Sequence, residues 1–155
     1  MWAHYADCHS GCVLGFANAS VDELNNMLVS SQWLWSHDCD YLIPQDVKYT
    51  DARPNIFNSE GLTNTRENGF DACVIKAKAW EYEQEVRVIK MKPAGIYPFH
   101  LSQLRSIRFG LNIDPLQRKK IIGIVTSITK SNSMKIRLFD VKIDHKNFKF
   151  NDVKC

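Results

Sequence analysis

The fold of this chain is decided largely by residues 76–90, KAKAWEYEQEVRVIK. Its first half predicts the end of a helix over residues 72–82, for which Asp71 is the cap. From residue 83 on the period changes to two, which predicts a strand with Val86 and Val88 on one side. Three carboxylates and several cations crowd this junction, and charge of that density at an element boundary is unusual for a purely structural segment.

Two further helices are predicted from local start signals. Ser20 and Glu23 match a capping box, which predicts a helix over 21–33. Asp114 followed by proline predicts a second helix that begins at residue 115. With the segment at 72–82, the chain is expected to contain about three helices.

The remaining segments predict strands. We expect strands at 11–16, 47–50, 105–110, 134–143 and 148–153. The first of them is a short apolar run and is expected to be buried. The last two form a C-terminal β-hairpin around a turn at 144–147, and residues 53–69 read as a long loop. The predicted class is α+β, with a mixed or antiparallel sheet, in a single domain over residues 1–155.

The composition is that of an ordinary globular protein. The chain has 155 residues, 45% of them hydrophobic and 24% charged, with a net charge of +3. That charge is too small to predict nucleic-acid binding, although the last third of the chain is the more cationic part. No apolar run approaches a membrane span, and the start of the chain does not resemble a secretory signal. Five cysteines without a secreted spacing pattern indicate reduced thiols and a cytoplasmic location.

Glu83 and Glu85 are the candidate catalytic residues. Two carboxylates that lie this close repel each other, so one should have a raised pKa unless a cation compensates. Lys76 and Arg87 are the available cations, and Trp80 would be a stacking wall or a core residue. One interpretation is a surface salt-bridge ladder. The other is an active-site pair that holds a ribose hydroxyl or stabilises an oxocarbenium ion.

A second cluster lies at residues 4–12. His4, Tyr5 and His9 are candidates for ligand hydrogen bonds, and the alternative is that they are capped or packed residues. Zinc is not expected, because only Cys8 and Cys12 stand close together and the strong zinc signatures use two such pairs. We predict no metal site.

A metal-dependent nuclease is a weaker alternative. Such enzymes use an acidic residue and a Glu-x-Lys strand to hold Mg²⁺. Here Glu85 is followed two residues later by Arg87 in the place of the lysine, and Asp71 lies on the predicted helix rather than on a strand. Serine-hydrolase, phosphate-loop and dinucleotide motifs are absent.

The two clusters together resemble a widespread bacterial family known mainly as a domain of unknown function. The resemblance rests on WAHYADCHSGCVLGF at 2–16, on residues 47–54 and on the K-x3-W-x-Y-E-x-E-x-R element at 76–87, and it spans about residues 2–128. Members carry a preceding segment with an Asn-Asp-Pro-Phe-like motif that this chain lacks. We therefore expect an N-terminal portion of the family to be missing.

That family is itself similar to ADP-ribosyltransferase-like folds, in which a glutamate at a strand start grips the nicotinamide ribose of NAD. The resemblance implies that Glu85 or Glu83 is this glutamate and that Tyr5 is a stacking or hydroxyl partner.

Three functions follow from these patterns. The favoured one is a non-catalytic or remnant interaction module of this fold, with a homo-oligomer interface formed by surplus aromatic side chains. The second is an NAD-dependent ADP-ribosyl transferase or glycohydrolase that uses Glu83 and Glu85. The third is the metal-dependent nuclease.

Overall fold

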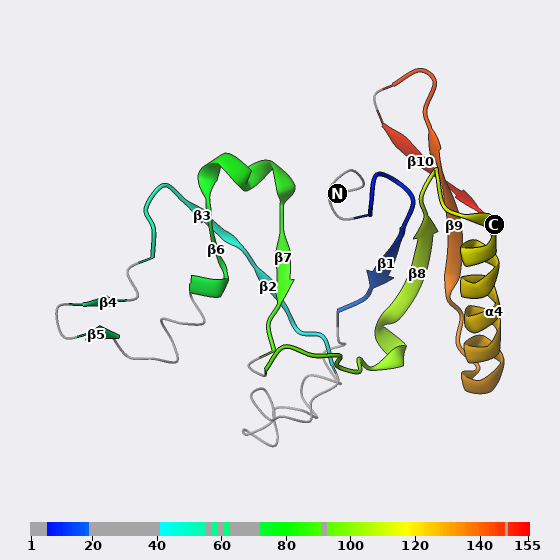
Figure 1. Ribbon diagram of the computed structural model, residues 1–155, viewed down its shortest axis with the longest axis horizontal. Coiled ribbons are helices and arrows are strands. Elements are labelled where there is room, and N and C mark those ends of the chain that lie inside the picture. Colours follow the sequence, from blue (N-terminus) through cyan, green and yellow to red (C-terminus); the bar gives the residue numbers. More distant parts are fainter. Residues whose placement is uncertain are drawn as a thin grey trace. The chain divides into compact units, whose positions relative to one another are not determined.

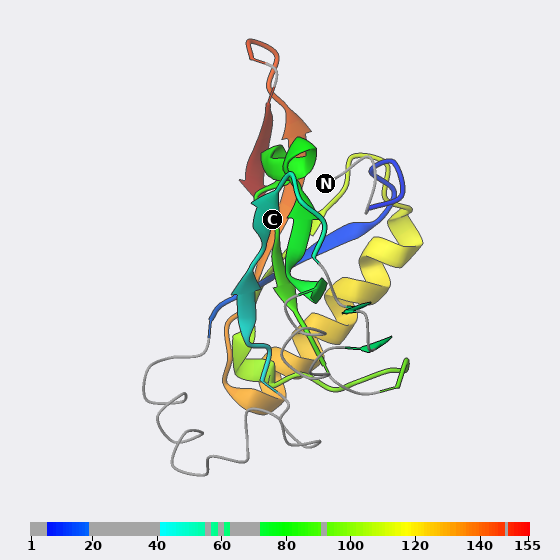
Figure 2. The ribbon, with the colours of Figure 1, turned by 90° about the vertical axis from the view of Figure 1, so that its left-hand side faces the viewer.

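The computed structural model describes residues 6–18, 41–54, 57–58, 61–62, 72–90, 93–147 and 149–155. These residues belong to two compact units (Figures 1 and 2). Unit 1 combines Met1–Ala17 with Phe99–Cys155, and unit 2 is Asn18–Pro98.

Unit 1 contains a four-stranded sheet in the order β1-β8-β9-β10. The strands are β1 (Cys12–Phe16), β8 (Leu104–Phe109), β9 (Arg137–Ile143) and β10 (Phe150–Lys154). The β1–β8 and β9–β10 pairs are antiparallel, whereas β8 and β9 are parallel. The mixed sheet and the C-terminal hairpin are therefore confirmed. Asp144 closes the hairpin turn by accepting hydrogen bonds from the backbone N–H groups of Lys146 and Asn147, at 2.8 and 3.1 Å.

Helix α4 (Pro115–Asn132) connects the parallel strands β8 and β9 (Figure 1), because parallel neighbours require a crossover. It begins as predicted: Pro115 occupies the first turn, and the Asp114 carboxylate accepts the Gln117 N–H at 2.9 Å. The helix packs Val125 against Ile107 and Phe109 of β8, which form the core of unit 1. Among the described residues, no helix has the length and apolar character needed to cross a bilayer.

Unit 2 is built around one extended segment that contains β2 (Pro44–Asp46) and β3 (Lys48–Thr50). Strand β7 (Val86–Val88) pairs antiparallel with β2, and β6 (Ile75–Ala77) pairs parallel with β3. Val47 N–H donates to the Glu85 carbonyl, and the next N–H, of Lys48, donates to the Val74 carbonyl. Because successive N–H groups of a strand point to opposite edges, β7 and β6 flank the segment on opposite sides.

The 3-10 helix η1 (Lys78–Glu83) links β6 to β7. The predicted helix over 72–82 is therefore wrong in its middle, where residues 75–77 form a strand, and the helical turn that follows is of the 3-10 type. Pairing of 75–77 with 48–50 supplies backbone hydrogen bonds that override the local helical pattern. In the described part of the chain, α4 is the one long helix, and the other helical pieces are the short η1, η2 (Leu101–Gln103) and residues 72–73, which is fewer full helices than the three or so that were expected.

Two other predicted segments, strand 11–16 and the loop 53–69, differ in part from expectation. Strand β1 exists, but it is not buried as expected, since Leu14 and Phe16 are 43% and 40% exposed. Inside the predicted loop, the two-residue strands β4 (Phe57–Asn58) and β5 (Gly61–Leu62) form an antiparallel pair. The predicted helix over 21–33 lies outside the described residues.

Candidate functional site

Strand register in unit 2 places the charged candidates on one face. Tyr49 pairs with Lys76, and Gln45 pairs with Arg87. Because Gln45 and Tyr49 are an even number of residues apart on one extended segment, they and their partners project to the same side. Glu85 comes two residues before Arg87 and joins this face. We call Lys76, Glu83, Glu85 and Arg87 the charged cluster.

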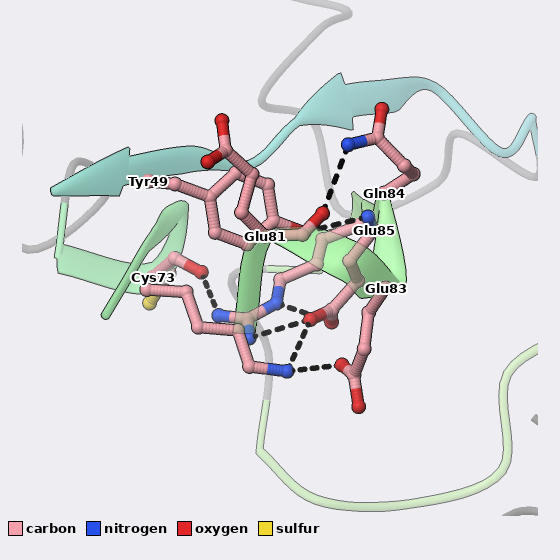
Figure 3. Close-up of polar contacts among 8 residues, drawn as sticks. Tyr49, Cys73, Glu81, Glu83, Gln84 and Glu85 are labelled. Carbon is pink, nitrogen blue, oxygen red and sulfur yellow. Dashed lines mark hydrogen bonds and ion pairs between the residues drawn. The ribbon is translucent and has the colours of Figure 1, made fainter. Parts of the chain in front are cut away.

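The charged cluster is a closed set of ion pairs (Figure 3). Lys76 Nζ contacts Glu85 Oε2 at 3.0 Å and also pairs with Glu83 Oε2. Arg87 holds Glu85 in a bidentate manner, with Nε 2.6 Å from Oε1 and Nη2 3.1 Å from Oε2. Both oxygens of Glu85 therefore accept from cations. Glu83 and Glu85 were expected on one strand. Instead, Glu83 is the last residue of η1 and Glu85 directly precedes β7, and Lys76 contacts both carboxylates.

Backbone contacts fix the cluster in place. The Glu85 N–H donates to the Tyr49 hydroxyl at 2.7 Å, and Arg87 Nη1 donates to the Cys73 carbonyl at 2.5 Å (Figure 3). Between the two glutamates, Gln84 takes a left-handed conformation with φ 47°, and its side chain donates to the Glu81 carbonyl at 2.9 Å. This kink turns the chain from η1 into β7, so that both carboxylates reach the same lysine.

The electrostatics follow from these contacts. Arg87, and after it Lys76, lower the pKa of Glu85 to about 2. The pKa of Lys76 is raised by Glu83 and Glu85, and that of Arg87 is raised by Glu85. The sequence left open whether a cation compensates the negative charge of the glutamate pair. At Glu85, Arg87 and Lys76 do so. At neutral pH this carboxylate is ionised and cannot donate a proton, so the arrangement suits holding charges in place rather than general acid catalysis.

Trp80 lies beside the cluster on η1. Its ring centroid is 5.0 Å from Lys76 Nζ, a cation–π distance, and 6.0 Å from the ring of Tyr82. Trp80 is 46% exposed and Tyr82 is 72% exposed. The two aromatic rings therefore form an exposed pair next to charges that already have partners.

The other predicted ligand residues are His4, Tyr5 and His9. His4 and Tyr5 lie outside the described residues. His9 belongs to unit 1, in a turn where Asp7, Cys8 and His9 all have positive φ. Its ring packs on Phe150 of β10 at 5.0 Å. The Asn112 N–H donates to the His9 carbonyl at 2.9 Å and helps to hold this unfavourable backbone.

Sequence reasoning missed three contributors: the Tyr49 hydroxyl, the kink at Gln84 and the Cys73 carbonyl. The alternation of residues 45, 47 and 49 was the available signal for Tyr49, because it predicts which strand positions share a face. The kink and the carbonyl leave no such signal. Among the described residues, no group of three or more His, Cys, Asp or Glu side chains could hold a metal ion.

The comparisons with known proteins identify a family whose function is unknown. A family described as "Protein of unknown function (DUF2971)" matches residues 1–88, which is more than half of the chain. The matched range contains β1 and the whole charged cluster, and it ends at the last residue of β7. No curated protein and no solved structure matches the chain. The chain belongs to the DUF2971 family of proteins of unknown function.

Proposed function

We propose that the chain is a non-catalytic interaction module, in which the charged cluster braces η1 and displays Trp80 and Tyr82 to a second copy of the chain. The observation that carries the proposal is the state of Glu85, whose two oxygens accept three contacts from Lys76 and Arg87 at 2.6 to 3.1 Å. A carboxylate in that state acts as a structural ion-pair partner.

The same observation weakens the enzymatic alternatives. An NAD glycohydrolase or ADP-ribosyl transferase would need Glu85 or Glu83 to accept hydrogen bonds from a ribose or to stabilise a developing positive charge. Arg87 and Lys76 already occupy the oxygens of Glu85, and Lys76 also neutralises Glu83. A Mg²⁺ ion would have to displace the same two cations, which disfavours the nuclease as well.

The exposed aromatic pair supports the interaction role. Trp80 and Tyr82 keep 46% and 72% of their surface accessible, and aromatic side chains are enriched at protein interfaces. The Lys76 ammonium lies 5.0 Å from the Trp80 ring centroid, a cation–π contact that favours one position of the ring. A rigid, exposed aromatic pair loses little conformational entropy when it is buried by a partner.

Self-association tests the proposal directly. Light scattering after size-exclusion chromatography should show the wild-type chain as an oligomer whose mass falls on dilution. Trp80→Ser combined with Tyr82→Ser should shift it to the monomer mass. The matched control is Ile96→Ser in the same unit, because Ile96 is fully exposed and lies outside the aromatic pair. A monomeric wild type, or equal effects of the control and the double variant, would overturn the interface.

Calorimetry with NAD and an assay for released nicotinamide test the non-catalytic part. We expect neither binding at millimolar NAD nor hydrolysis by the folded chain. Hydrolysis that Glu85→Gln or Glu83→Gln abolishes without lowering the melting temperature would establish the enzyme instead. Glu81→Gln removes an exposed carboxylate from the same turn and is the control for charge alone.

A further inference from the structure

Charge is distributed very unequally between the two units. Unit 1 contains twelve Lys and Arg residues and five Asp and Glu residues, a net charge of +7. Unit 2 contains eight basic and twelve acidic residues, a net charge of −4, so that the two units together give the chain's +3. The net charge of +3 for the whole chain therefore conceals the net charge of +7 on unit 1. A strongly basic unit is typical of a protein that binds a polyanion.

Within unit 1, the sheet has one face covered by α4 and one face that α4 does not cover. Ile107 and Phe109 of β8 pack against Val125 of the helix. The alternating residues, Ser106 and Arg108, must therefore project from the opposite face. The register extends this row across the sheet, since Arg108 pairs with Phe139 of β9 and Phe139 pairs with Lys154 of β10.

Arginine and aromatic side chains alternate on this second face. The Arg108 guanidinium lies 5.3 Å from the Phe139 ring, and that of Arg137 lies 6.0 Å from the same ring. Arg108 also donates to Asp152 at 2.7 Å and to Ser106 at 3.1 Å, so its orientation is fixed. A Cβ at Gly15 would lie 3.2 Å from Arg108 Nη1, and glycine at that position leaves room for the guanidinium to lie along the sheet.

The accessible part of this face lies around Arg137, Phe150 and Lys154, whereas Ser106 and Val141 of the same face are buried. Arg137 and Lys154 are exposed and form no ion pair with another described residue. Phe150 is 46% exposed, and one side of its ring is supported by His9 at 5.0 Å. Asp152 is the one acidic side chain that the register adds to the face, and Arg108 neutralises it. The uncompensated charge on the face is therefore positive, beside an aromatic ring that can stack.

We propose that this face of unit 1, formed by Arg108, Arg137, Phe139, Phe150 and Lys154, binds single-stranded nucleic acid. Arg137 and Lys154 supply phosphate contacts, and Phe150 offers a ring on which an unpaired base stacks. A duplex keeps its base faces inside the stack and cannot use Phe150 in this way. The proposal concerns unit 1 alone and does not depend on the function proposed for the charged cluster of unit 2.

Fluorescence anisotropy of a labelled 12-nucleotide oligouridylate, titrated with the full-length chain at several salt concentrations, tests the proposal. We expect binding that weakens linearly with log salt concentration. The double variant Arg137→Ala/Lys154→Ala should make that slope shallower by about 1.4, since each lost phosphate contact contributes about 0.7 for a single strand. Phe150→Ala should weaken binding by about fivefold or more, and a 12-base-pair duplex should bind more weakly than the single strand.

The matched control is Lys119→Ala/Lys120→Ala, which removes two exposed charges from α4 and so leaves the second face unchanged. It should leave the affinity and the slope close to wild type. The proposal is overturned if the wild-type chain does not bind at low salt, if this control weakens binding as much as the Arg137/Lys154 variant, or if the duplex binds as tightly as the single strand. Circular dichroism melts identify any variant that fails to fold. If Phe150→Ala does not fold, the Arg137→Ala/Lys154→Ala variant still tests the proposal, because both of its side chains are exposed.

Discussion

Replacing Glu85 by glutamine removes one charge from the charged cluster and keeps the shape of the side chain. The amide oxygen can still accept a hydrogen bond from Arg87, so the change isolates the electrostatic part of the interaction. Because Arg87 and Lys76 hold the pKa of Glu85 at about 2 in the folded state, the ionised form is favoured by folding. The variant should therefore be less stable than the wild type at neutral pH.

The size of the effect follows from linkage. A carboxyl with an ordinary pKa of 4.5 that falls to about 2 on folding contributes at most about 3 kcal/mol, at about 1.4 kcal/mol per pKa unit. The Glu85 side chain is 28% exposed, so water screens part of this interaction. We expect a loss of about 1 to 2 kcal/mol at pH 7. Since the folded pKa is the lower one, the contribution is complete above about pH 4.5 and disappears as the pH falls toward 2.

Amide hydrogen exchange measured by NMR gives a local readout in unit 2. The N–H groups of Val47 and Lys48 donate to the carbonyls of Glu85 and Val74, so their protection reports on the pairing that the cluster stabilises. The protection free energy should fall in Glu85→Gln by the amount given above at pH 7. The difference between wild type and variant should shrink steadily below pH 4.5, after correction for intrinsic exchange rates.

Comparing the variant with wild type at each pH cancels the titration of other carboxylates. Glu81→Gln, on the same turn, should leave the protection of both amides unchanged. The reasoning would be refuted by equal protection in wild type and Glu85→Gln at pH 7, or by a difference that persists unchanged at pH 2.5.

Four further substitutions test other contacts of the structure. Lys76→Met removes one of the two cations that lower the pKa of Glu85, so that pKa should rise in a carboxyl ¹³C NMR titration, whereas Lys78→Met should not move it. Gly123→Ala in α4 should stabilise unit 1 by about 0.5 to 1 kcal/mol in thermal melts, because a Cβ there meets no atom within 4 Å. Gly110→Ala should destabilise it, since its Cβ would overlap the His9 carbonyl, and effects of the same sign at both glycines would contradict this account. Asp114→Ala should cost about 1 kcal/mol through loss of the helix cap, and an unchanged melting temperature would show that the cap contributes nothing.

Elements with local signals were predictable from the sequence. The start of α4 depends on Asp114 and Pro115, and the C-terminal hairpin depends on a turn whose carboxylate, Asp144, bonds backbone groups two and three residues away. Both signals lie within four residues of the structure that they create. The segment at 75–77 is different, because its partner strand at 48–50 lies 27 residues away and no local pattern identifies it. Nonlocal pairing therefore accounts for the wrong helix.

The same distinction applies to the charged cluster. Lys76 and Arg87 were expected as the compensating cations because they lie within nine residues of Glu85, and both contact it. The hydroxyl that accepts the Glu85 N–H comes from Tyr49, 36 residues away. The sequence could therefore predict which charges meet, but it could not predict how the backbone holds them.

The charge of unit 1 shows why composition alone pointed away from a nucleic acid. Unit 1 is discontinuous, with residues 18–98 inserted between its first strand and the rest of its sheet. An average over the whole chain therefore mixes the acidic unit 2 with the basic unit 1, and the result is an unremarkable +3. Only strand order assigns Cys12–Phe16 to the same sheet as Arg108 and Arg137, and only register places those two arginines on one face. An electrostatic argument about partners applies to a surface, so it requires the topology first.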